Sequence, residues 1–137
     1  MADLSVTAAN VALITGLTGS ANSGVAIGQG KSVSVDPSDG LAYLYEADST
    51  TAARRVLTGV ALTSSAIGQP CVYAAPGAVI NPGATVAAGA VYVGSATPGG
   101  IAPVADLTSG MYTSILGVGL AANRLQLAIV NSGVAVP

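Results

Sequence analysis

Glycine and proline interrupt this chain so often that its apolar segments all stay short. The 137 residues include 18 Gly and 7 Pro, and Gly, Ser, Thr, Asn or Pro ends each apolar run. Short apolar runs separated by turn residues are typical of an all-β fold. The same interruptions argue against a membrane-spanning helix, which needs about 20 consecutive apolar residues. We therefore expect a mainly β protein with no membrane partner.

The first clear element is a β-hairpin at residues 33–45. Val33 and Val35 alternate with serine, and the turn at 36–40 reads Asp-Pro-Ser-Asp-Gly, residues that favour reversal of the chain. Residues 48–56 predict the one short helix, with Asp48 or Ser49 as its cap. Further strands are expected at 56–62, 70–75, 90–96, 100–104, 114–120, 124–130 and 133–137.

The chain also repeats itself at an offset of about 58 residues. The shared order is a hairpin, an acidic turn and a Gly-Val-x-Leu strand. The matching pairs include Val33 with Val91, Val35 with Val93, Asp48 with Asp106, Gly59 with Gly117 and Leu62 with Leu120. The repeat indicates duplication and predicts a small β-barrel or β-sandwich built from two repeated hairpin units.

Residues 1–24 differ from the rest and have two interpretations. An apolar stretch is followed by Gly, Ser and Asn at 19–24, which predicts an extended N-terminal arm and a flexible link, leaving 25–137 as the β-rich domain. Alternatively, residues 4–15 form the first strand of the domain. The first ten residues lack the basic start and apolar core of a signal peptide, so we expect synthesis in a cytoplasm.

Charge is scarce in this sequence. Hydrophobic residues make up 51% and charged residues 7%, against roughly 25% charged in an ordinary soluble domain. A surface so poor in charge suggests that other subunits cover much of it. The four basic residues, Lys31, Arg54, Arg55 and Arg124, are scattered. Nucleic acid is therefore not an expected partner, because phosphate binding needs a basic stripe.

Reactive chemistry is hard to assemble from these residues. The chain has no His and one Cys, Cys71, which we expect to be a buried thiol. Asp36, Asp39 and Asp48 read as turn residues, since their spacing lacks the alternating oxygen ligands of a calcium loop. We expect no enzyme activity, no catalytic residues, no bound metal and no cofactor.

Three partial motifs also favour structural interpretations. Residues 24–32 approach a phosphate-binding loop, but Gly24 is one residue too far from Gly30 and a strand follows where a helix is needed. A biotinyl or lipoyl carrier needs a lysine at a hairpin tip, and Lys31 lies far from the Gly-rich segment 77–89. Tyr43 and Tyr45 would point the same way on a strand as a stacking platform, although packing at a barrel edge is favoured.

The sequence resembles the tailed-phage head decoration, or capsid cement, proteins over residues 26–136. The similarity is carried by Gly-Val-Ala-Leu at 59–62, Gly-Gln-Pro at 68–70, the stretch 95–106, Leu-Gly-Val at 116–118 and the ending Asn-Ser-Gly-Val-Ala-Val. These residues are of low complexity, and residues 1–25 contribute little to the resemblance.

The resemblance implies a non-enzymatic structural protein of the virion, made in the host bacterial cytoplasm. Such a protein binds the capsid exterior, commonly as a homotrimer, and clamps neighbouring major capsid subunits around the packaged DNA. It further implies that an N-terminal arm adds a strand to the capsid lattice, with Leu4, Val6, Val11 and Leu13 as its capsid-binding apolar positions. The alternative is a trimeric fibre or receptor-binding module of a phage head or tail.

Overall fold

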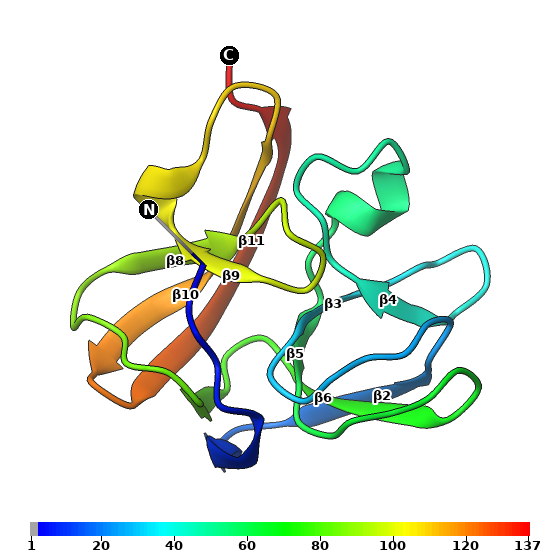
Figure 1. Cartoon of the computed structure of the whole chain (residues 1–137), viewed down its shortest axis with the longest axis horizontal. Coiled ribbons are helices and arrows are strands. Elements are labelled where there is room, and N and C mark those ends of the chain that lie inside the picture. The colour runs from blue at the N-terminus through cyan, green and yellow to red at the C-terminus, as the bar shows by residue number, and fades with distance from the viewer. Residues whose placement is uncertain (1–2) are drawn as a thin grey trace.

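Two antiparallel sheets, seen in a computed structural model that describes residues 3–137, make up most of the protein (Figure 1). The six-stranded sheet contains, in spatial order, β1 (Val11–Thr15), β7 (Val79–Pro82), β11 (Arg124–Ala135), β10 (Tyr112–Ala121), β8 (Val91–Gly94) and β9 (Ile101–Pro103). The five-stranded sheet contains β2 (Thr18–Asn22), β6 (Pro70–Ala74), β5 (Gly59–Ala61), β3 (Ser32–Val35) and β4 (Ala42–Leu44). The mainly β prediction is confirmed, and the arrangement is that of a β-sandwich.

Helical structure is confined to three short 3₁₀ turns, η1 (Ala8–Asn10), η2 (Ala52–Arg55) and η3 (Val104–Asp106). The predicted helix at 48–56 is thus reduced to η2. Its N-cap is Thr51, and neither Asp48 nor Ser49 occupies that position. No helix within residues 3–137 is both long enough and apolar enough to cross a membrane.

The main core lies between the two sheets. Tyr45, Val60 and Ala74 come from the five-stranded side, and Leu116 and Leu127 come from the six-stranded side. A second, smaller core packs Ile27, Val33 and Cys71 on the other face of the five-stranded sheet. Each fully buried Val, Leu or Ile side chain contributes roughly 1.5–3 kcal/mol, so the sheets are held together mainly by small aliphatic residues.

The predicted hairpin at 33–45 is confirmed as β3 paired with β4, with Val33 opposite Leu44 and Val35 opposite Ala42. Asp36 shapes the turn, since its Oδ1 accepts a hydrogen bond from the Ser38 backbone N–H at 2.8 Å. The later hairpin is β8 paired with β9. Gly99 in its corner has φ +73°, a conformation that glycine adopts without strain.

The strand neighbours recur between the sheets. β3 lies between β4 and β5, and β8 lies between β9 and β10. β5 then pairs with β6, and β10 pairs with β11. The register differs by one residue, because Gly59 faces Val33 whereas Gly117 faces Tyr92.

The N-terminal segment lies on the body of the protein in this structure. β1 pairs with β7, and Val11 is only 5% exposed. The predicted flexible link is instead β2, which pairs with β6 from Thr18 opposite Ala74 to Asn22 opposite Pro70. An extended arm is therefore not seen, and the alternative interpretation, a first strand, describes residues 11–15. Residues 1 and 2 of the predicted arm lie outside the described residues.

Candidate functional site

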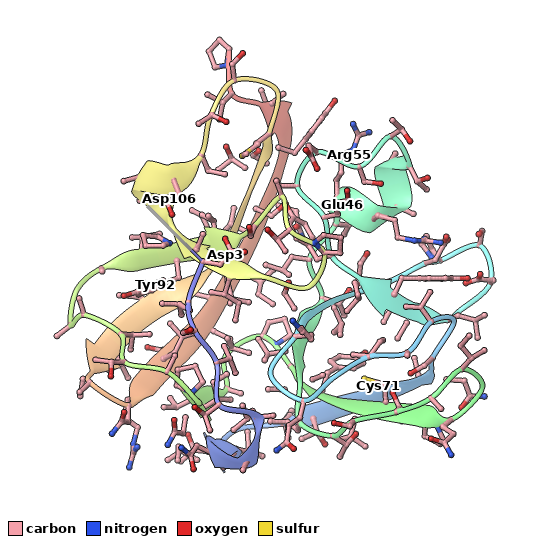
Figure 2. All side chains as sticks on the ribbon, in the orientation of Figure 1. Asp3, Glu46, Arg55, Cys71, Tyr92 and Asp106 are labelled. Carbon is pink, nitrogen blue, oxygen red and sulfur yellow. The ribbon has the colours of Figure 1, made fainter. Side chains whose placement is uncertain are left out.

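Turn η2 joins the two sheets through its backbone carbonyls. The Ser34 hydroxyl, from β3, donates to the carbonyl of Ala53. The Ser114 hydroxyl, from β10, donates to the carbonyl of Arg55 at 3.1 Å. Both serines are buried, so each satisfies a polar group that burial would otherwise make costly. The turn is thereby fixed with two adjacent arginines at its end, beside Glu46 (Figure 2).

Arg54 is held by a carboxylate and an aromatic ring. Its guanidinium forms an ion pair with Asp36 at 2.8 Å and lies 3.4 Å from the centre of the Tyr43 ring. The hydrogen bond from Arg54 is the main cause that lowers the pKa of Asp36 from 3.8 to about 2, aided by Ser38. The Tyr43 hydroxyl donates to Asp39, which raises the pKa of Tyr43. These contacts hold the Arg54 side chain in place. We call the Asp36–Arg54–Tyr43 contact the clasp, because it links η2 to the β3–β4 hairpin.

Arg55 forms a second stack, 3.8 Å from the centre of the Tyr112 ring. The two residues line a cleft of about 330 Å³ together with Val56 and Asn131. The Asn131 side chain is committed to the backbone of Leu57, accepting from its N–H at 2.7 Å and donating to its carbonyl at 3.0 Å. This cleft therefore presents the Tyr112 ring with its stacked guanidinium and aliphatic atoms, and the Asn131 amide is already hydrogen-bonded.

The tyrosines do not form a stacking platform. Tyr45 is completely buried in the main core, and burial raises its pKa. Tyr43 instead packs under Arg54, so the two tyrosines have different surroundings and each is occupied by packing. Tyr92 is 5% exposed and accepts a hydrogen bond from the Ala87 N–H. The packing role favoured from the sequence describes these residues.

Potentially reactive side chains are also engaged in structure. Cys71 is buried as predicted, and burial raises the pKa of its thiol. Asp3 accepts a hydrogen bond from the Ser95 hydroxyl at 2.7 Å, in a cleft of about 180 Å³ that Asp106 also lines. Lys31 is exposed and directly precedes β3, a strand rather than the helix that a phosphate-binding loop requires. Among residues 3–137, His, Cys, Asp and Glu form no group of three placed to hold a metal.

The proposed arm residues all face the body. Leu4 and Leu13 pack against the main core. Val6 is partly buried and Val11 is buried. The structure thus packs all four against the domain, where their burial stabilises the fold.

The exposed surface carries large apolar side chains that the sequence analysis did not single out. Leu17 is 79% exposed and Ile67 is 72% exposed. The others are Ile14, Val56, Val104, Leu120, Val130 and Val134. Alternation along the strands is the signal that could have found Val130, because Leu125 and Leu127 on β11 face the core.

No known protein family matches the chain, and neither a curated protein nor a solved structure matches it.

Proposed function

We propose that this protein is a non-enzymatic structural protein of a phage head, which binds the outside of the capsid and clamps neighbouring major capsid subunits. The observation that carries the proposal is the surface. It combines four basic and six acidic residues in the whole chain with exposed aliphatic side chains such as Leu17 and Ile67. Charge is depleted in the buried centres of protein interfaces, so this composition fits a protein covered by other subunits.

The architecture supports a clamp in a second way. Glycines with positive φ shape the turns, and short strands between them pack into two cores. A clamp needs a rigid shape and contact area, and repeated attachment of many copies makes weak contacts count. Location on the virion exterior and assembly as a homotrimer belong to this proposal.

The capsid contact is proposed to use the exposed aliphatic side chains. Attachment through Leu4, Val6, Val11 and Leu13 stays a prediction, and it requires the N-terminal segment to leave the body. The alternative function, a fibre or receptor-binding module, would use an exposed aromatic patch. The separate packing of Tyr43, Tyr45 and the other tyrosines offers it little support.

A duplication is proposed to underlie the fold. Equivalent glycines at the offset of the sequence repeat meet the same obstacle, because a Cβ on Gly59 would collide with the Ala74 carbonyl of β6 and one on Gly117 with the Gln126 carbonyl of β11. The recurring neighbours of β3 and β8 agree with this origin.

The decisive experiment is quantitative mass spectrometry of purified particles of the phage that encodes this chain. Copy numbers near those of the major capsid protein are expected. A handful of copies would replace the proposal with a fibre or vertex role, and absence from the particle would overturn it. Ile67→Ser should reduce retention on the capsid, whereas the control Thr63→Ser, at an exposed position nearby in sequence, should not.

A further inference from the structure

Residues 3–7 lie across the junction between the two sheets as an extended strap (Figure 1). The Leu4 N–H donates to the carbonyl of Ile101 in β9 at 2.7 Å, and the Thr7 N–H donates to the carbonyl of Gly83 at 2.7 Å. Asp3 anchors the start of the strap on Ser95 (Figure 2). The body of the protein thus holds the strap through backbone hydrogen bonds and through a side-chain hydrogen bond.

The seat of the strap is built from glycines. A Cβ on Gly30 would lie 2.7 Å from Val6 Cγ1 and 2.9 Å from Val11 Cγ2. A Cβ on Gly83 would lie 2.6 Å from the Thr7 carbonyl oxygen. These distances are shorter than any ordinary carbon contact, so the close approach of the strap requires residues without side chains. The groove is fitted to this segment.

Side chains of the strap alternate between two environments. Leu4 and Val6 line a cleft of about 280 Å³ that also includes Gly30 and Ile101. Ser5 and Thr7 line a polar cleft of about 320 Å³ on the other side. Alternation of this kind is how a bound extended peptide is recognised, with main-chain hydrogen bonds and pockets for every second side chain.

The turn that would act as the hinge of the strap has no buried residues. Turn η1 (Ala8–Asn10) follows the strap, and none of its three residues is buried. Its backbone bonds are Asn10 N–H to the Thr7 carbonyl and Val11 N–H to the Ala8 carbonyl. Straightening this turn would free the strap while β1 stayed paired with β7.

We propose that this groove is an interaction site for the strap of a second copy of the chain, so that residues 3–7 exchange between protomers. The occupant is chosen because the groove already holds this sequence, and another copy offers the same residues. Exchange of an identical element is a route to dimers that costs little, since the contacts formed match those lost. The exchange needs no capsid protein, so its test is separate from the test of capsid binding.

Two complementary full-length variants test the exchange. The donor, Gly30→Ala, has an intact strap, and its added methyl group blocks the groove at Val6 and also presses on Val11 of β1. The acceptor, Leu4→Asp with Val6→Asp, has an open groove and a strap that no longer fits. Each should be a monomer alone, and an equimolar mixture at micromolar concentration should give a heterodimer of twice 13.1 kDa by native mass spectrometry.

The matched control for the donor is Gly77→Ala. Gly77 has φ +91° against +88° for Gly30, and nothing lies within 4 Å of the added Cβ. It therefore carries the same backbone strain with the groove open. Its strap remains bound in its own groove, so its heterodimer with the acceptor should be at least about tenfold weaker, because only the released fraction can bind.

Absence of heterodimer between a folded donor and a folded acceptor would overturn the proposal. Equal self-association of both variants alone would also overturn it, since the interface would then lie elsewhere. If the donor fails to fold, a fluorescent peptide of residues 1–10 replaces it. Fluorescence anisotropy should show that the peptide binds the acceptor. The control is the same peptide carrying Leu4→Asp and Val6→Asp, which should not bind. If the unsubstituted peptide binds no better than this control, the exchange is overturned.

Discussion

The guanidinium of Arg54 lies 3.4 Å from the centre of the Tyr43 ring while it pairs with the carboxylate of Asp36 at 2.8 Å. Tyr43 belongs to β4 and Asp36 follows β3, so one side chain from η2 ties down both ends of a hairpin turn. A guanidinium can do this because its plane stacks on a ring while its N–H groups bond in that plane. Three charged residues of this chain meet here, Asp36 and Arg54 directly and Asp39 through the Tyr43 hydroxyl, and they stabilise the fold.

Acid should weaken this clasp. The folded-state pKa of Asp36 is lowered to about 2 from 3.8, so its contribution is fully present above about pH 4 and disappears as the pH falls through about 2. Asp36→Asn should therefore unfold at lower urea concentration than the wild type at pH 6, with the difference shrinking at pH 2. Urea unfolding followed by circular dichroism measures this. A difference that stays constant down to pH 2 would show that the carboxylate charge is irrelevant.

The two equivalent glycines should be equally intolerant of a side chain. Gly59→Ala and Gly117→Ala each force a methyl group against a carbonyl of the neighbouring strand. Each should lower the free energy of unfolding by about 1–3 kcal/mol, as overpacking usually does. Gly28→Ala is the control, because the nearest atom to its added Cβ is Lys31 Cγ at 3.7 Å, and its effect should stay within about 0.5 kcal/mol. Sensitivity at only one of the pair would argue against duplication.

Cys71 offers a reporter for the opening of the five-stranded sheet. It is fully buried in the smaller core beside Ile27 and Val33, and burial raises its thiol pKa. Because the thiolate is the reactive form, a thiol reagent at pH 8 should label the native protein far more slowly than the urea-unfolded protein. Labelling of the native protein at the rate of the unfolded chain would mean that this core is open in solution.

The sequence predicted the strands that carry clear alternation and clear turns, and it missed those that do not. Val33 and Val35 before Asp-Pro-Ser-Asp-Gly marked a hairpin, and β3 with β4 confirms it. β2 consists of Thr, Gly, Ser, Ala and Asn, and Gly, Ala and Asn are depleted in strands. It is a strand because it pairs with β6, and only the tertiary structure supplies that partner.

The N-terminal segment shows a different limit of sequence reasoning. Leu4 and Val6 carry the same apolar pattern whether the strand is added to another protein or to its own domain. Whether the segment packs on its own domain depends on the shape of the groove, which is made by Gly30 and Gly83 far along the chain. The exposed apolar residues could not be predicted from the sequence either. Whether Leu17 and Ile67 are exposed depends on which face the fold leaves uncovered.

Two truncations separate the strap from the first strand. Removing residues 1–7 deletes the contacts of Leu4 and Val6, which are partly buried, and should cost about 1–3 kcal/mol of unfolding free energy. Removing residues 1–15 also deletes β1, with buried Val11 and its pairing to β7. The loss should then exceed that of the shorter truncation by about 2 kcal/mol or more, since a buried aliphatic side chain and its strand disappear together. Chemical unfolding of both chains beside the full protein measures the difference. Equal stability of the two truncations would mean that residues 8–15 behave as an arm after all, and β1 would have to be regarded as loosely attached.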